Sequence, residues 1–443
     1  MKRLIKAIKK NGWWKSEEGN QLFNALSSIM SNRNKYLIPF ILITSLFFFW
    51  GLIINLDSIL IPHLRKAFRL NTLQSSLIDS SVFIAYFIMA IPAGIIMQRL
   101  GYKAGIIIGL LFFAIGSLLF VPAANTREYA FFLGALFVIA CGLAMLETAA
   151  NPYATVLGPE NTSTQRLNFA QSFNGLAVVI APLIGGRFIL SGKEYTDADL
   201  AKMTDQAKEI YLQSEAGSVK GPYIIIGMLI LVVAILFLLI KLPDIKEEKT
   251  ERKNLFHTLR HRHLAWAVIA QFFYVGAQVC ITSFFINLTT RSAGINEKLA
   301  AEYLGWGYGI AFMTGRFFGT FLMKYVQPAR LLSVYAAVNI VLSLLAILSK
   351  GMITVYALIG IGFFMSIMFP TIFALGIKGL GHETKIGSSL IIMSIVGGAL
   401  LPPILGYISD VTKNIQNGYM VPLVCFIVVL FFGLKGYKIK SLQ

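Results

Sequence analysis

The sequence predicts an all-α membrane protein whose twelve transmembrane helices form two similar six-helix bundles. The 443-residue chain is 56% hydrophobic and only 14% charged, with a mean hydropathy of +0.70, whereas soluble domains carry about 25% charged residues. Apolar stretches of about 20 residues recur along it, and each is long enough to cross a hydrocarbon core of about 30 Å. Because no water pairs with the backbone there, these stretches are expected to be helices.

Twelve stretches meet this description, six on each side of a long basic loop. They are residues 37–61, 74–97, 104–123, 128–157, 165–191, 221–242, 264–288, 299–323, 330–349, 352–376, 386–408 and 418–437. The predicted organisation is a basic N-terminal segment (1–35), a first bundle (36–242), a cytoplasmic basic linker (243–263) and a second bundle with a short tail (264–443). The N-terminal segment is interpreted either as a basic amphipathic helix on the inner leaflet or as a solvated tail.

The distribution of charge predicts which loops face the cytoplasm. A net charge of +18 would suggest a nucleic-acid partner for a soluble protein, but here the basic residues gather in loops that an N-inside topology places in the cytoplasm. They fill residues 241–262 and the tail from Lys435, whereas the loop 192–220 is acidic by comparison; the basic loop 63–69 disagrees with this topology. We expect a monomeric multi-pass protein of the cytoplasmic membrane, with both termini cytoplasmic and no nucleic-acid partner.

The two halves of the chain repeat one another at nearly constant offsets. Gly51 and Gly276 are 225 residues apart, and "NPYATVLG" at 151–158 parallels "FPTIFALG" at 369–376 with an offset of 218. Matching motifs in the same order indicate a duplicated six-helix unit. Parallel six-helix halves related by an axis along the membrane normal are one plan of secondary transporters.

Several motifs give the chain a family resemblance. The segment "GIIMQRLGYKAG", between the second and third spans, resembles the inter-helix loop motif of the major facilitator superfamily, with Gly94, Arg99, Gly101 and Lys103 in place. From about residue 36 to 435 the chain resembles the bacterial L-fucose–proton symporters, the fucose/glucose/galactose permease family, through "PFILITSLFFFWG", "LETAANPYATVLGPE", "RLNFAQSFN", "WAVIAQFFYVGAQ" and "GGALLPPILGYISD". The resemblance implies the major facilitator fold and alternating-access import of a monosaccharide, with protons as the usual coupling ion.

One carboxylate lies in the middle of the fourth span. Glu147 is the only formal charge between Ala130 and Pro159, and an ionised carboxylate at mid-membrane costs about 2.5–3.5 kcal/mol on insertion scales. Such a residue usually faces a cavity or a partner, and burial favours its neutral form, which suits reversible protonation. Asn151, one turn further on the same face, is a candidate for binding a sugar hydroxyl or orienting the carboxylate. The alternative is a static ion pair with an arginine of another helix; the resemblance implies that Glu147 takes part in proton coupling.

The first helix departs from the family pattern. The family reads Asn-Leu-Asn-Asp where this chain reads Asn55, Leu56, Asp57 and Ser58. The carboxylate therefore stands one residue earlier, and one residue along a helix turns a side chain by about 100°. Asp57 is either a second proton-coupling residue, reached from a distorted helix end, or the partner of a cation at the outer mouth. Asn55 and Ser58 still share a face and are candidate substrate-binding residues.

Polar residues at helical spacing mark two further faces. Each set is expected to point into the bundle, where amides and hydroxyls either bind sugar hydroxyls or only bond one helix to another. The sets are Asn168, Gln171 and Asn174 in the fifth span, and Gln271, Tyr274 and Gln278 in the seventh. Apart from Asn168, these residues are predicted to bind substrate, together with Asn151.

Four charged residues are assigned to gates. Asp79 and Arg187 lie near the outer ends of the second and fifth spans and are predicted to form a bridge. Arg99 belongs to the loop motif between the second and third spans. Arg316, in the eighth span, is expected to pair with a carboxylate or to brace the cytoplasmic gate.

The residues point to secondary transport rather than to catalysis. The sequence has no nucleophile-and-base arrangement and no phosphate-binding Gly-Lys-Ser/Thr loop, so neither an enzyme nor ATP drive is expected. His257, His261 and His263 have a metal-like spacing, but a solvated basic segment is the better interpretation, and no metal or cofactor is expected. The predicted function is proton symport of a monosaccharide of the fucose, galactose or glucose class. The alternatives are a sodium-coupled or facilitative sugar transporter and a non-transporting sugar sensor.

Overall fold

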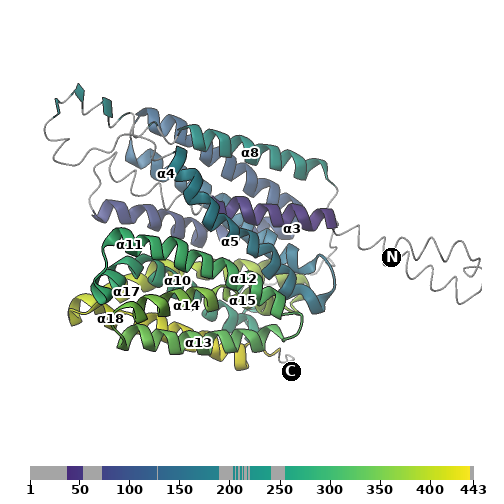
Figure 1. Ribbon diagram of the computed structural model, residues 1–443. Coiled ribbons are helices and arrows are strands. Elements are labelled where there is room, and N and C mark those ends of the chain that lie inside the picture. The colour runs from purple at the N-terminus through teal and green to yellow at the C-terminus, as the bar shows by residue number, and fades with distance from the viewer. Residues whose placement is uncertain are drawn as a thin grey trace, which may run out of the picture.

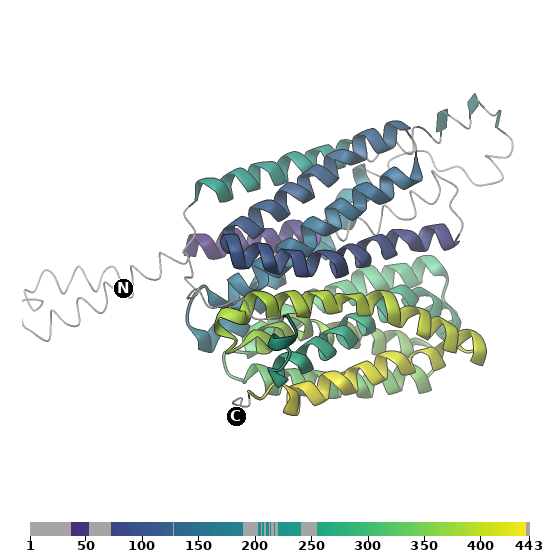
Figure 2. The same ribbon diagram turned by 180° about the vertical axis from the view of Figure 1, so that it is seen from behind.

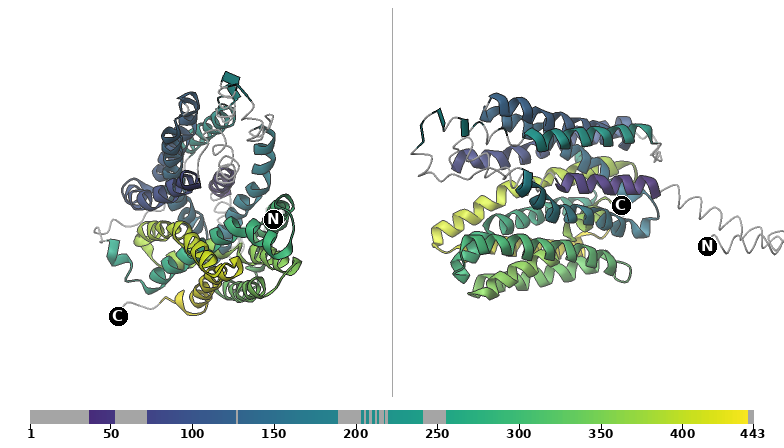
Figure 3. Two further views of the ribbon diagram at one scale, coloured as in Figure 1. Left: turned by 90° about the vertical axis from the view of Figure 1, so that its left-hand side faces the viewer. Right: turned by 45° about the horizontal axis from the view of Figure 1, so that its top comes forward.

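The computed structural model describes residues 37–52, 72–126, 128–188, parts of 203–240, and 255–439. Within these residues the regular structure is helical and contains no strand. Figure 1 shows two layers of long helices, with the first half of the chain (purple to teal) above the second half (green to yellow). Seen end-on, the two halves lie against each other along a seam (Figure 3).

The first half contains the helical segments expected from its apolar stretches. Their bounds are Leu37–Leu52, α3 (Thr72–Thr126), α4 (Tyr129–Val156), the short 3₁₀ turn Glu160–Thr162, α5 (Ser163–Phe188) and α8 (Lys220–Leu239). Helix α3 covers both the second and the third predicted span. Its backbone leaves helical geometry at Gly101, where φ is 85° and ψ is 172°, a conformation open to glycine and strained for other residues. Gly101 therefore makes the turn between two spans.

The second half has the same number of spans, several of them interrupted. Their bounds are α10 (Arg262–Ala293); α11 (Glu297–Glu302), a π-helical turn (Tyr303–Gly309) and α12 (Ile310–Leu322); α13 (Pro328–Leu348); α14 (Met352–Met365) and α15 (Met368–Ile377); α16 (Thr384–Met393), a 3₁₀ turn (Ser394–Val396) and α17 (Gly397–Thr412); and α18 (Ile415–Gly418), α19 (Met420–Phe431) and a π-helical turn (Phe432–Gly436). The short helix α9 (Leu255–Thr258) precedes them, and the 3₁₀ turn Gly381–Glu383 joins α15 to α16.

The helices fit the prediction of twelve membrane spans in two bundles. Eight helical stretches in the described residues are by themselves long and apolar enough to cross a membrane, and the first of these, Ser81–Thr126, holds two predicted spans. Their outward faces carry exposed Leu, Ile and Phe side chains, whereas Asn151, Asn168 and Gln271 are fully buried. This distribution suits a lipid solvent, and it confirms that the polar faces point inward. The predicted domain boundaries at 1–35 and 243–263 lie largely outside the described residues and stay a prediction.

Close contacts hold the two halves together along the seam. A Cβ atom added to Gly94 of α3 would lie 2.0 Å from Ser389 Oγ of α16 and 3.4 Å from the carbonyl oxygen of Lys385. Helices α3 and α16 contact each other here, and Figure 2 shows the blue helices of the first half above the yellow-green helices of the second. Nearby, Gln165 Nε2 of α5 donates to the carbonyl oxygen of Thr320 in α12 at 3.2 Å. These contacts lie at the end of the bundle that the predicted topology assigns to the cytoplasm.

Candidate functional site

Glu147 is buried in the middle of α4. Its side chain is 3% exposed, and the Tyr86 hydroxyl donates to Oε1 at 3.3 Å. No described residue forms a hydrogen bond with Oε2, and none of the described Arg or Lys side chains forms an ion pair with this carboxylate. The static Glu–Arg pair considered from the sequence is therefore not found among the described residues. One neutral hydroxyl offsets little of the cost of burying a charge, so this environment suits a carboxyl group that gains and loses a proton.

A pair of amides lies one helical turn from Glu147. Gln171 Nε2 of α5 donates to Asn151 Oδ1 of α4 at 2.8 Å, and both side chains are buried. Asn151 Nδ2 finds no hydrogen-bond partner among the described residues. On the same face of α5, Asn168 Nδ2 donates to Thr371 Oγ1 of α15 at 3.1 Å. The polar stripe of α5 thus forms bonds both within its own half and across the seam.

The polar face of α10 has buried groups that lack partners. Gln271 and Tyr274 are 0% exposed, and neither amide atom of Gln271 nor the Tyr274 hydroxyl is hydrogen-bonded to a described residue. Buried polar atoms are nearly always paired in native proteins, so these three atoms, on residues one turn apart, are free of the described residues and available to another polar group. Gln278, one turn further, is half-buried. Asn174 of α5 is also half-buried, and its backbone packs so closely on Gly51 that a Cβ there would lie 2.8 Å from the Asn174 carbonyl oxygen.

Arg316 joins the two halves through backbone carbonyls. The side chain is 3% exposed; Nε donates to the Ser366 carbonyl at 2.8 Å, and a terminal nitrogen donates to the Gln171 carbonyl at 2.9 Å. The guanidinium also lies 4.6 Å from the centre of the Phe312 ring. Arg316 thus bonds to backbone of both halves, and the expected carboxylate partner is not found among the described residues. Its role as a gate stays a prediction.

A protein-family model matches most of the chain. The family model described as Major Facilitator Superfamily matches residues 40–401. The chain belongs to the Major Facilitator Superfamily. Its fold, with two six-helix bundles meeting at a seam, is the arrangement implied by the internal repeat.

Within the superfamily, the chain is similar to bacterial sugar transporters. It is 42% identical over 422 residues to the L-fucose-proton symporter of Escherichia coli strain K12, covering 93% of this chain and 96% of that protein. It is 40% identical over 419 residues to the glucose/galactose transporter of Brucella abortus, covering 94% and 98%. A crystal structure of the Major Facilitator Superfamily transporter FucP in the outward conformation matches with a TM-score of 0.84 and 43% identity, over 90% of this chain and 98% of that one.

Several predicted residues of this superfamily member lie outside what the structure describes. Asn55, Asp57 and Ser58 fall in the interval 53–71, which the described residues do not include. Asp79 and Arg187 lie within α3 and α5, but their side chains are outside the described part, so the predicted bridge between them stays a prediction.

Three residues of the loop motif between the second and third spans differ in their contacts and exposure. Lys103 Nζ donates to the carbonyl oxygens of Leu238 and Ile240 at 2.9 and 3.0 Å, which caps the end of α8. Gly101 makes the turn. Arg99 is exposed, and its gating role stays a prediction.

Three residues that were not predicted as site residues make contacts with predicted residues or across the seam. Tyr86 and Thr371 contact Glu147 and Asn168. Lys385 is 7% exposed, and its ammonium group lies 5.0 Å from the centre of the Tyr102 ring in the opposite half. Lys385 could have been noticed in the sequence, because it is a lone lysine at the start of an apolar span. For Tyr86 and Thr371 no sequence pattern indicates the partner.

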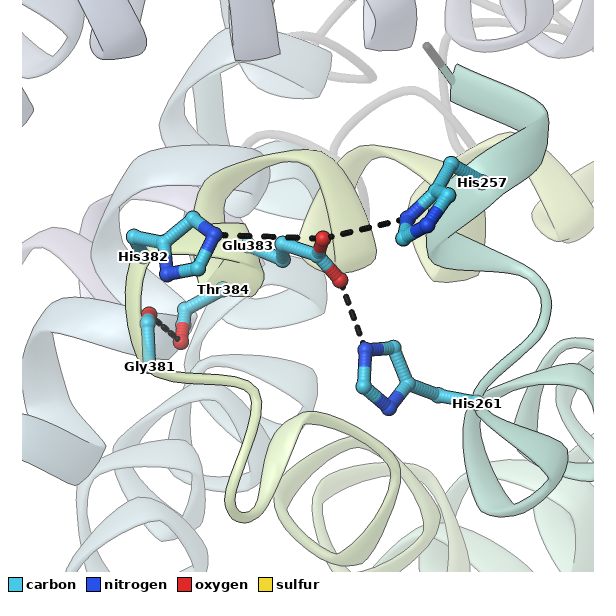
Figure 4. A network of polar contacts seen from close by, with 6 residues as sticks. All are labelled: His257, His261, Gly381, His382, Glu383 and Thr384. Carbon is cyan, nitrogen blue, oxygen red and sulfur yellow. Dashed lines mark hydrogen bonds and ion pairs between the residues drawn. The ribbon is translucent and has the colours of Figure 1, made fainter. Parts of the chain in front are cut away.

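A carboxylate–histidine cluster lies at the predicted cytoplasmic end of the second half (Figure 4). His261 Nε2 lies 2.7 Å from Glu383 Oε2, while His257 Nδ1 and His382 Nε2 lie 3.4 and 3.9 Å from Oε1. Glu383 is 4% exposed and His263 is 2% exposed. The expectation of a fully solvated basic segment is therefore wrong here: one carboxylate ties α9 and the start of α10 to the turn before α16.

Replacing Glu383 by Gln is expected to destabilise this end of the protein by about 1–2 kcal/mol, because the hydrogen bond between His261 and a charged carboxylate is lost in a largely buried place. The measurement is the apparent melting temperature of the purified protein, with the exposed Glu297→Gln as a matched control. If both variants melt at the wild-type temperature, the cluster contributes nothing to stability.

Proposed function

We propose that this protein imports a monosaccharide of the fucose, galactose or glucose class by proton symport through alternating access. The observation that carries the proposal is a buried carboxyl group, Glu147, which pairs with no cation of the described residues, together with buried amide atoms that no described residue bonds. The relatives named L-fucose-proton symporter and glucose/galactose transporter support both the substrate class and the coupling ion.

The sugar site is proposed where polar groups of both halves remain available. Gln271 and Tyr274 of α10 provide three atoms, and Asn151 of α4 one amide nitrogen, that are not hydrogen-bonded to any described residue. Amide and hydroxyl groups pair with sugar hydroxyls, and aromatic rings pack on the apolar faces of a sugar. Phe369 lies edge-on to Tyr274 with ring centres 6.3 Å apart, so one aromatic surface is already in place. Asn174, Gln278 and, on the first helix, Asn55 and Ser58 are further proposed contacts.

The proton site is proposed at Glu147, within a chain of contacts that reaches the seam. Glu147 lies one turn from Asn151, Asn151 accepts from the Gln171 side chain, and the Gln171 carbonyl accepts from Arg316. A change of charge on Glu147 therefore occurs next to groups that bond α4, α5 and α12 together. This connection offers a physical route from protonation to rearrangement of the halves. Asp57 stays a second candidate for the proton path.

Gln271→Ala is expected to weaken sugar binding by up to about tenfold while leaving the melting temperature of the sugar-free protein unchanged. Loss of a hydrogen bond to a neutral partner is worth about 0.5–1.5 kcal/mol, and no described residue bonds to Gln271, so no internal bond is lost. Calorimetric titration of fucose, galactose and glucose in detergent provides the measurement.

Gln171→Ala and the exposed Gln98→Ala serve as comparisons. Gln171 also bonds to Asn151, so its variant is expected to lose both affinity and stability, whereas Gln98→Ala is expected to lose neither. Unchanged affinity in Gln271→Ala for every sugar tested would remove α10 from the proposed site.

The coupling ion and the placement of the chain complete the proposal. Proteoliposomes given a pH gradient or a sodium gradient separate proton symport from sodium symport. Uptake that occurs only down a sugar gradient, with no accumulation under either ion gradient, indicates facilitated diffusion.

We place the protein in the cytoplasmic membrane as a monomer with both termini in the cytoplasm, in accord with the basic loops of the sequence. A sugar sensor without transport would bind sugar and accumulate none under either gradient.

A further inference from the structure

A groove lies on the seam between the two halves, at the predicted cytoplasmic end. Its volume is about 310 Å³, and it is bounded by the start of the first helix, the start of α5 and the end of α12. Figure 1 shows α5 and α12 next to one another on the lateral surface of the bundle. The residues that matter here are Phe40, Arg166, Phe169, Phe317, Phe321 and Lys324. None of them belongs to the proposed sugar or proton site.

The walls of the groove are aromatic and come from both halves. Phe169 of α5 is 41% exposed, and Phe317 and Phe321 of α12 are 38% and 50% exposed. Phe40 stacks on Phe169 with ring centres 6.1 Å apart. Exposed phenylalanines on the lateral surface of a membrane-spanning bundle lie against acyl chains. The groove can therefore hold a hydrocarbon chain in contact with both halves.

Two cations, Arg166 and Lys324, line the groove. The Arg166 guanidinium donates to the carbonyls of Ala154, Thr155 and Pro159, which are neutral acceptors at the end of α4. Lys324 is exposed, and its ammonium group lies 5.3 Å from the centre of the Phe321 ring. Among the described residues neither cation forms an ion pair. The positive charge of Arg166 is thus held in a fixed position and is not neutralised by any carboxylate of the described residues.

We propose that this groove binds an anionic phospholipid of the inner leaflet, with the phosphate at Arg166 and Lys324 and an acyl chain along Phe169, Phe317 and Phe321. Basic pockets between transmembrane helices on the cytoplasmic side are suited to anionic head groups, and the charge and apolarity of this groove match the two ends of such a lipid. A soluble phosphate would use the cations and leave the aromatic walls uncovered. The bound lipid touches α5 and α12, so it stabilises the contact between the halves at this end.

The test measures contact between lipid and the groove itself. A Phe321→Trp variant, whose indole replaces a wall of the groove, is titrated with mixed micelles containing phosphatidylglycerol or phosphatidylcholine that carries brominated acyl chains, which quench nearby tryptophan. The same reporter is combined with Lys324→Gln, which removes a proposed phosphate contact, or with Lys378→Gln, which removes an exposed lysine of the predicted cytoplasmic end outside the groove. The parent protein without the reporter gives the background from the native tryptophans.

Phosphatidylglycerol is expected to quench the reporter at a mole fraction several-fold lower than phosphatidylcholine. Lys324→Gln is expected to raise that mole fraction about fivefold, as expected for one basic residue near a lipid head group, while Lys378→Gln leaves it unchanged. Soluble glycerol phosphate in excess is expected to have no effect. Equal quenching by both lipids, equal effects of the two lysine variants, or relief of quenching by glycerol phosphate would each overturn the proposal, the last by showing a site for free phosphate.

Discussion

Replacing Glu147 by Gln is expected to abolish sugar accumulation driven by a pH gradient while leaving sugar exchange across the membrane at least partly intact. Gln has the shape of the protonated carboxyl group but cannot release a proton. Since the described residues provide Glu147 with one hydroxyl donor and no cation, the neutral amide replaces the neutral acid without leaving a buried charge unpaired. The internal-to-external sugar ratio should fall to about one, because without coupling the sugar only equilibrates.

The measurement is uptake by proteoliposomes with an imposed pH gradient, followed by counterflow of labelled sugar on the same preparation. Glu302→Gln, which neutralises an exposed carboxylate at the end of α11, outside the proposed site, is the matched control and should accumulate sugar as the wild type does. Wild-type accumulation in Glu147→Gln would exclude this residue from the proton path and leave Asp57 as the acidic candidate.

Gly94→Val is expected to lower transport by roughly 5- to 150-fold. The side chain would enter a contact in which even a Cβ lies 2.0 Å from Ser389 Oγ and 3.4 Å from the Lys385 carbonyl oxygen. Overpacking of this kind costs about 1–3 kcal/mol, and the cost falls on the arrangement in which α3 and α16 touch. Since alternating access requires this contact to form and break, penalising one arrangement lowers the population that carries sugar.

A graded series separates this effect from misfolding. Gly94→Ala should be milder and should be restored by Ser389→Ala, which removes the oxygen nearest to the added methyl group. Gly134→Val adds the same side chain where no heavy atom lies within 4 Å, and it should transport normally. Uptake is measured in proteoliposomes, after size-exclusion chromatography has shown that each variant elutes as the wild type does. Normal uptake by Gly94→Val would mean that the seam at this point plays no part in closure.

Both predictions depend on residues that the sequence identified, although for different reasons. Glu147 stands out because one charge among about thirty apolar and small residues is costly in a bilayer, and the structure adds Tyr86 as its partner. Gly94 stands out only as a member of a loop motif, and the motif does not say what approaches it. Asp57 and Ser58 show the opposite case: the sequence reveals a departure from the family pattern, and the described residues do not include them.

The sequence by itself determined the class of fold, the number of spans, their inward-facing polar sides and the mid-membrane carboxylate. It could do so because the bilayer requires every span to be apolar over a similar length and to satisfy its backbone hydrogen bonds internally. Apolar length and helical spacing are both local properties of the sequence. The tertiary structure alone decided which residues meet across the seam. Arg316 bonds to a carbonyl 145 positions away, and Asn168 to a threonine 203 positions away. Such contacts arise from the packing of whole helices, in which a glycine or a backbone carbonyl can be the partner, and neither carries a side-chain signal that a sequence pattern could show.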